Sequence, residues 1–137
     1  MAPTPMPLIR LTLLLKKRND ITHEEFHHHW THIHGPLVSA WLRRHGVIRY
    51  VQYHQPPELR AKATALWEFL GADSISEWDG HVQLYVPSLD CIANALNDPF
   101  YREVVVPDEE KFISVRSCQR TVGYEECFIE DNRRVER

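Results

Sequence analysis

The order of strand-like and helix-like segments is the feature that most constrains the fold of this chain. Four segments carry the alternating or β-branched patterns typical of strands: residues 8–15, 47–54, 81–86 and 112–128, the last with a break near Gly123. Prolines close two of them, Pro56–Pro57 after the second and Pro87 after the third. The sequence therefore predicts four strands with helical segments between them.

Helix signals fall between the predicted strands. Thr22 and Glu25 form a T-x-x-E capping box, which predicts a helix from about His23 to His32. Gly35–Pro36 should interrupt this helix, because proline has no amide hydrogen and disfavours helical backbone in the residue before it. Further segments are predicted at 37–44, ending at Gly46, at 58–70 as a helix or an ordered loop, and at 89–96, capped by Ser88.

The resulting order, β–α–β–(α)–β–α–β, is that of an α+β protein with the ferredoxin-like split βαβ arrangement. We expect a four-stranded antiparallel sheet with helices on one face. The other face then needs cover, and a second copy packed sheet against sheet is the simplest cover, so we expect a homodimer. Residues 1–137 should form a single domain, with residues 1–7 and 130–137 as flexible tails.

Charge and cysteine use exclude several classes of protein. The 137 residues carry a net charge of −3 without a basic stripe, which argues against a nucleic-acid-binding surface. No apolar run reaches the roughly 20 residues of a membrane span, and residues 1–7 do not resemble a secretory signal. Three widely spaced cysteines without a C-x-x-C pair favour free thiols in a reducing compartment. We therefore expect a cytoplasmic protein with no nucleic-acid or membrane partner.

Six of the nine histidines fall within the twelve positions 23–34. Residues 23–27 match the H-E-x-x-H pattern of zinc proteases. However, His23 stands at the first helical position, and Trp30 occupies the place where the metzincin extension of the pattern needs glycine. We therefore expect no metal at this motif.

The histidines of this segment differ in their expected surroundings. A helical wheel places His28, His29 and His32 on the solvated side of the predicted helix. His34 instead directly precedes the expected turn at Gly35–Pro36, where its side chain can face a pocket. His34 is therefore the histidine of this segment that we expect to be functional.

Two of the predicted strands place polar side chains together on one face. Asp79, His81, Gln83 and Tyr85 share one face of their strand, as do Tyr50, Gln52 and His54 of theirs. Such a face either lines a cavity or meets solvent. If it lines a cavity, His34 at the end of its helix and His81 on a strand beneath it can face the same pocket.

An ordered set of short motifs runs from Leu13 to Phe112. It comprises LLLKKR at 13–18, T-x-x-E-F at 22–26, W-x-x-x-H-x-P at 30–36, RYVQ at 49–52, DG at 79–80, DP at 98–99, and PDE at 107–109 followed by Phe112. In these motifs the chain resembles the EthD-like family of the dimeric α+β barrel superfamily. The segment TVGYEE at 121–126 is similar to the fungal branch of that family found in aromatic polyketide gene clusters.

The resemblance implies a homodimer in which each protomer has a pocket between its sheet and its helices. It also implies a cofactor-free, metal-free lyase that tailors an aromatic polyketide, first by decarboxylation of an anthrone- or anthraquinone-type carboxylic acid. The alternatives are dehydration of a hydroxylated intermediate, polyketide cyclisation, cofactor-free monooxygenation and non-catalytic ligand binding.

The expected site combines the motif positions with the strand pattern. The catalytic candidates are His34, His81, Tyr50 and Asp79, and the substrate-binding candidates are Phe26, Trp30, His54 and Tyr85. Histidine can carry the proton because its ordinary pKa of about 6.5 lies near neutral pH. Tyr50 can donate a hydrogen bond to an oxyanion, and Phe26 with Trp30 can form a flat apolar wall for fused rings.

Overall fold

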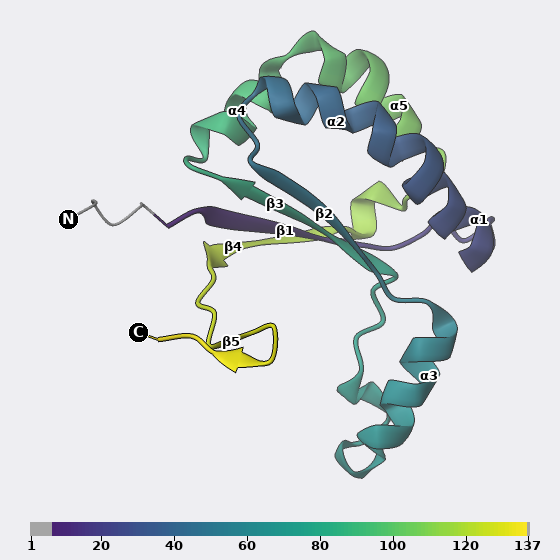
Figure 1. The fold of residues 1–137 in the computed structure, drawn as a ribbon. Helices are drawn as coiled ribbons and strands as arrows, with labels where there is room; N and C mark the ends of the chain where they lie inside the picture. Colours follow the sequence, from purple (N-terminus) through teal and green to yellow (C-terminus); the bar gives the residue numbers. More distant parts are fainter. Residues whose placement is uncertain (1–6, 137) are drawn as a thin grey trace.

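The computed structural model describes residues 7–136 and contains a four-stranded sheet in the order β2-β3-β1-β4, in which all neighbours are antiparallel (Figure 1). The strands are β1 (Ile9–Leu15), β2 (Arg49–His54), β3 (Gly80–Val86) and β4 (Gln119–Tyr124). The α+β, ferredoxin-like arrangement predicted from the order of elements is confirmed. Of the expected N-terminal tail, only Pro7 falls within the described residues.

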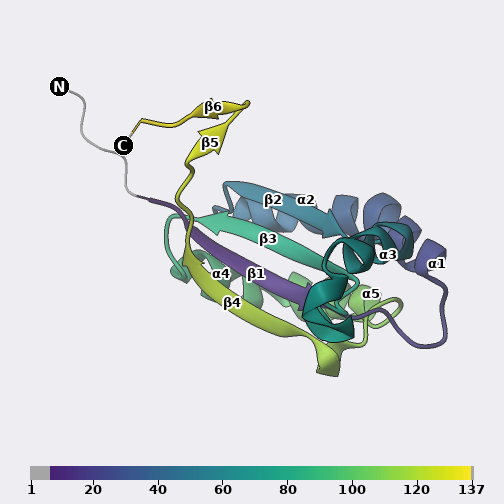
Figure 2. The same ribbon diagram turned by 90° about the horizontal axis from the view of Figure 1, so that it is seen from below.

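Most helices cover one face of the sheet. Figure 1 shows α1 (His23–His29), α2 (Gly35–Arg44), α4 (Asp90–Asn97) and α5 (Val106–Glu109) on that side. The helix α3 (Pro57–Leu66) lies on the other side, beyond the end of the sheet, and Figure 2 shows it in front of the strands. Among residues 7–136, no helix is both long and apolar enough to cross a membrane.

The first helical segment is continuous, so the predicted break at Gly35–Pro36 is wrong. The capping box of Thr22 and Glu25 is present, and α1 passes through the π-helical turn η1 (Trp30–His34) directly into α2. The amide of Gly35 donates to the carbonyl of Trp30, the wide spacing of a π turn. This turn lets Pro36 stand in the first turn of α2, where its missing amide hydrogen costs little.

The same arrangement occurs a second time, later in the chain. The π-helical turn η4 (Tyr101–Val105) leads into the short helix α5, and Pro107 stands in the first turn of that helix. Helical residues pass through each junction without a break in backbone conformation. Because π turns often occur at functional sites, these two junctions are candidate positions for one.

The core between the sheet and its helices consists of two clusters. The first contains Leu11, Val38, Trp41, Leu42, Leu84, Ala95 and Val105, and the second contains Leu15, Phe26, Trp30, Phe112 and Ile113. Leu13 and Val82 lie on the two central strands, beneath the helices, and contact both clusters. Both residues are nevertheless partly exposed. The core is therefore less completely buried at these two residues, where the clusters adjoin, than within either cluster.

The other face, here called the open face, carries the alternate residues of the strands. On β1, β2 and β3 they are Arg10, Thr12, Leu14, Arg49, Val51, Tyr53, His81, Gln83 and Tyr85, and on β4 they are Gln119, Thr121 and Gly123. The face mixes apolar, aromatic and charged side chains rather than being uniformly apolar. No helix lies across the middle of this face in Figure 2.

The C-terminal part differs from the prediction in two places. The fourth strand begins at Gln119, because Val115–Ser117 form a 3₁₀ turn and Ile113 makes only an isolated bridge with Lys17. Where we expected a frayed tail, β5 (Ile129–Glu130) pairs with β6 (Arg133–Arg134) in a short hairpin.

Candidate functional site

A histidine and an aspartate from the two π-turn junctions form the centre of the site. The Nδ1 atom of His34, the last residue of η1, lies 2.8 Å from Oδ2 of Asp108 in α5. Both residues are buried. Burial lowers the pKa of His34, while the hydrogen bond to Asp108 opposes that change. The Nε2 atom of His34 has no hydrogen-bond partner among residues 7–136 and is not sealed from solvent, so it remains available as a base.

A second histidine shares the same carboxylate. The Nε2 atom of His29 lies 3.1 Å from both carboxylate oxygens of Asp108. Burial would raise the pKa of Asp108, but the hydrogen bonds from His34 and His29 outweigh it and hold that pKa below its ordinary value. Phe112 packs against both imidazoles, with ring centroids 4.7 Å from His29 and 5.0 Å from His34. The carboxylate is thus fixed as an acceptor for two imidazoles.

The position of His29 corrects its predicted placement on the solvated side. Only 18% of its side chain is exposed, because α5 packs along the flank of α1 that the helical wheel assigned to solvent. His28 and His32 are exposed as expected, with their rings 4.6 Å apart.

A half-buried glutamate, Glu109, follows Asp108 in α5. Burial raises the pKa of Glu109 to about 7, although the positive charge of Arg120 opposes the change. Burial is the main cause of the raised pKa of Tyr50 and of Tyr101, and the charge of Glu109 adds a smaller contribution to each. No side-chain hydrogen bond or ion pair of Glu109 forms within residues 7–136. Near neutral pH, this carboxyl can therefore release or take up a proton.

Tyr50 and His54 lie on the helix-covered side of β2, on the face predicted from strand alternation. Burial raises the pKa of Tyr50, whose hydroxyl accepts a hydrogen bond of 2.9 Å from the side-chain amide of Gln52. His54 lies with its ring 4.3 Å from that of Trp30, and its Nδ1 atom is 2.6 Å from Nδ1 of His27. Burial, with a smaller contribution from the charge of His27, lowers the pKa of His54 to about 4.

His81 and Tyr85 do not join this group. Their neighbours Val82 and Leu84 pack beneath the helices, so strand alternation turns His81 and Tyr85 to the open face. The ring of His81 stacks on Tyr53 with 4.9 Å between centroids, and the Tyr85 hydroxyl donates to Glu125. The expectation that His34 and His81 face one pocket is therefore wrong.

The three remaining candidates are all buried: Asp79, Phe26 and Trp30. Asp79 is buried, accepts the amide of Lys17 at 2.8 Å, and lies 3.5 Å from Nδ1 of His23. Phe26 and Trp30 have no exposed surface at all, because both belong to the second core cluster. They therefore cannot form the wall of an open substrate pocket in this structure.

The H-E-x-x-H motif does not gather a metal site. His23 faces Asp79 and His27 faces His54. Across the part of the chain that the structure describes, no three histidine, cysteine, aspartate or glutamate side chains are placed to hold one ion.

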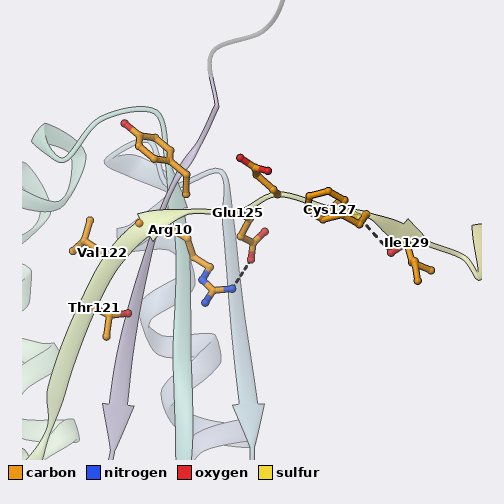
Figure 3. A pocket seen from close by; sticks show the side chains of 10 residues that line it. Arg10, Thr121, Val122, Glu125, Cys127 and Ile129 are labelled. Atoms are coloured by element: carbon orange, nitrogen blue, oxygen red, sulfur yellow. Dashed lines mark hydrogen bonds and ion pairs between the residues drawn. The ribbon is translucent and has the colours of Figure 1, made fainter. Parts of the chain in front are cut away.

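A surface hollow of about 570 Å³ lies at the sheet edge where the C-terminal segment leaves β4 (Figure 3). Figure 3 shows Arg10 and Glu125 joined across it, at 2.6 Å, and Glu125 also accepts from Tyr85. Among residues 7–136, no histidine lines this hollow. Arg10 and Glu125 already form an ion pair with each other. The hollow is therefore less suited to proton transfer than the site that contains His34, Asp108 and Glu109.

Asp108, His29 and Glu109 were missed as site residues. The sequence did hold a signal, since PDE at 107–109 with Phe112 is among the motifs of the family resemblance. What the sequence could not show is that this motif folds back onto His34.

Named enzymes are similar to this chain over most of its length. The Dehydratase aurZ of Gibberella zeae is 30% identical over 131 residues, covering 96% of this chain and 86% of that protein. The Decarboxylase nsrE of Aspergillus novofumigatus is 26% identical over 126 residues, covering 92% and 83%.

Solved structures share the fold. An ethyl tert-butyl ether d (EthD) family protein from Bacillus halodurans aligns with a TM-score of 0.55 at 16% identity, over 87% of this chain and 99% of that one. A dimeric ferredoxin-like protein of unknown function from Thermobifida fusca aligns with a TM-score of 0.54 at 12% identity, over 87% and 92%. These likenesses agree with the ferredoxin-like sheet order described above.

The family resemblance drawn from the short motifs is confirmed. Residues 18–116, which include His34, Tyr50 and Asp108, match the family model described as the EthD domain. This chain therefore belongs to the EthD domain family.

Proposed function

We propose that this chain is a cofactor-free lyase that removes water from, or carbon dioxide from, an aromatic polyketide intermediate. Relatives named as dehydratases and decarboxylases support the reaction class. The observation that carries the proposal is the His34–Asp108 pair, in which the imidazole directs one nitrogen to a buried carboxylate and leaves the other unpartnered within residues 7–136. Such a pair is suited to removing a proton.

Dehydration would use three groups of this site: His34, Tyr50 and Glu109. His34 Nε2 removes the proton from the carbon beside a ketone, and the electron pair of that C–H bond forms an enolate. The Tyr50 hydroxyl donates a hydrogen bond to the enolate oxygen. The enolate then expels the neighbouring hydroxyl, which takes a proton from the Glu109 carboxyl and leaves as water. The proton gained by His34 and the one lost by Glu109 balance, so no cofactor is required.

Decarboxylation is the second candidate, and the names of relatives such as nsrE favour it. Here loss of carbon dioxide leaves an enolate or phenolate, Tyr50 stabilises the oxygen, and Glu109 delivers a proton to carbon. A neutral His34, with its pKa lowered by burial, is less suited to this route because the first step needs no base. The base, unpartnered within residues 7–136, therefore supports dehydration as the first candidate and decarboxylation as the second.

The incomplete burial of Leu13 and Val82 supports a substrate position between the two core clusters. They lie on the same face of the sheet as Tyr50, and Arg120 pairs with Leu13 on the adjacent strand. An aromatic ring placed there would meet apolar surface below and the acid–base groups of the helices above.

Product mass tests the reaction class directly. The purified protein is incubated with hydroxylated and carboxylated aromatic polyketides, and the products are analysed by mass spectrometry. Loss of water or loss of carbon dioxide supports the proposal. Gain of oxygen, or binding without conversion, would replace the lyase with an oxygenase or a ligand-binding protein.

We further propose that two copies pair through their open faces, in the cytoplasm. The solved ferredoxin-like relative described as dimeric supports the pairing, and the free thiols of Cys91 and Cys118 support a reducing compartment. Sedimentation at micromolar concentration should show a dimer. A stable monomer would contradict the pairing but leave the helix-covered site intact.

A further inference from the structure

A row of hydrogen-bonded side chains runs from Tyr50 to His27 beneath the first π turn. The Nε2 atom of Gln52 lies 2.9 Å from the Tyr50 hydroxyl and 2.8 Å from the carbonyl of Trp30. The Oε1 atom of Gln52 lies 2.9 Å from Nε2 of His54, and the two Nδ1 atoms of His54 and His27 are 2.6 Å apart.

The direction of these hydrogen bonds follows from the one partner that cannot change its role. The backbone carbonyl of Trp30 can only accept, so the atom of Gln52 that faces it is the amide nitrogen. The second hydrogen of that nitrogen then points to the Tyr50 oxygen, which acts as an acceptor. The indole nitrogen of Trp30, which can only donate, is buried without a hydrogen-bond partner among the described residues.

The opposite end of Gln52 sets the tautomers of the two histidines. The oxygen of Gln52 accepts, so the His54 Nε2 atom carries a hydrogen. Burial lowers the pKa of both His54 and His27, which keeps both rings neutral near pH 7. The His54 Nδ1 atom is then an acceptor, and the hydrogen between the rings belongs to Nδ1 of His27.

One consequence concerns the hydrogen of the Tyr50 hydroxyl. Within residues 7–136, the hydroxyl donates to no protein atom, because its contact with Gln52 is used as an acceptor. We propose that Gln52 and His54 are positioning residues that hold the Tyr50 hydroxyl as a hydrogen-bond donor for a substrate oxygen. This inference rests on the proposed lyase function, in which that oxygen becomes negatively charged.

The close approach of Gln52 to the helix depends on Gly35. A Cβ atom at position 35 would lie 2.8 Å from Gln52 Nε2 and 3.3 Å from the Trp30 carbonyl oxygen. Glycine at the start of α2 therefore leaves room for the amide that anchors the row.

The substitution Gln52→Glu reverses the direction of the row. A carboxylate cannot donate, so it takes the Tyr50 hydrogen for itself and leaves the Trp30 carbonyl without a donor. Turnover should fall by about 10²–10³-fold, the usual cost of losing one oxyanion donor, with KM changed far less than kcat. The turnover of Tyr50→Phe should fall by a similar factor. The double variant Gln52→Glu/Tyr50→Phe should have a turnover only slightly below that of Tyr50→Phe alone. Gln119→Glu, the same change at an exposed position on β4, should have turnover near that of the unaltered protein.

Nitrogen-15 NMR of the side chains in the ligand-free protein tests the row independently of activity. His54 should carry its hydrogen on Nε2 and His27 on Nδ1, both neutral at pH 7. A hydrogen on Nδ1 of His54, or full additivity of Gln52→Glu and Tyr50→Phe, would overturn the inference. If the tautomers are as stated but no substrate is converted, the lyase proposal fails and the hydrogen-bonded row stands as a structural element without the catalytic role.

Discussion

His34 Nδ1 lies 2.8 Å from Asp108 Oδ2, although 74 residues separate them in the chain. Each residue stands at the junction of a π turn with the following helix, and Pro36 and Pro107 occupy matching places in those helices. Phe112, whose ring centroid lies 5.0 Å from that of His34, belongs to the core cluster that the partly exposed Leu13 and Val82 also contact. One ring of the core thus separates the acid–base pair from these two partly exposed residues.

The first prediction concerns the carboxylate that orients His34. Asp108→Asn preserves the size of the side chain, but the amide can no longer hold both imidazoles as hydrogen donors. Turnover should drop by about 10²–10⁴-fold while KM changes little, because orientation and tautomer of the base are lost. Steady-state kinetics check this. Glu110→Gln, at the exposed position two residues later, is the control, and equal turnover in the two variants would contradict the role of Asp108.

The second prediction is a pH profile. The proposed route needs neutral His34 and protonated Glu109. Burial lowers the pKa of His34, so activity should be lost on acidification only at pH values below the ordinary histidine pKa. Burial raises the pKa of Glu109 to about 7, so activity should also be lost as the pH rises through about 7. Glu109→Gln should reduce turnover and remove the alkaline fall. An alkaline fall that persists unchanged in this variant would assign it to another group.

The same carboxyl should influence stability in a direction that can be worked out. Its folded pKa, about 7, lies above the ordinary value of 4.5, so the folded chain binds more protons between these values than the unfolded chain. The contribution of Glu109 to stability is therefore present below pH 4.5 and declines as pH rises toward 7. Urea unfolding of the unaltered protein and of Glu109→Gln at pH 5 and pH 8 measures the difference, since glutamine does not titrate. The free energy of unfolding of Glu109→Gln, relative to that of the unaltered protein, should be larger at pH 8 than at pH 5. A smaller relative value at pH 8 would contradict a raised pKa for Glu109.

A fourth prediction tests the packing that holds the first π turn on the sheet. The ring of Trp30 lies directly against Gly80, and a Cβ atom there would meet that ring and lie 2.7 Å from the carbonyl oxygen of Tyr53. Gly80→Ala should destabilise the fold by about 1–3 kcal/mol, the usual cost of overpacking. Gly123→Ala is the matched control in β4, since nothing lies within 4 Å of its Cβ position. Equal unfolding midpoints for the two variants would mean that the Trp30 contact relaxes freely.

Local patterns predicted the sheet and part of the site. Strand alternation placed Tyr50, Gln52 and His54 on one face, and the structure confirms it. The apolar neighbours Val82 and Leu84 also held the information that turns His81 to the open face, because a helix-covered face takes the apolar side. That misplacement was therefore avoidable.

The central pair could not be derived in the same way. Whether Pro36 breaks a helix depends on a π turn that sequence patterns do not reveal. The burial of His29 depends on α5 packing beside α1, a contact between distant segments that a helical wheel omits. The chemistry of Asp108 and Glu109 emerges only when these contacts bury them.

The most direct measurement of the central claim is turnover of His34→Ala beside His32→Ala. Both histidines belong to η1, but His34 is buried against Asp108 whereas His32 is exposed. With circular dichroism confirming that both variants are folded, His34→Ala should lose about 10²–10⁴-fold in turnover and His32→Ala should stay near the unaltered protein. Unchanged turnover in His34→Ala would show that His34 is not the base and would contradict the account.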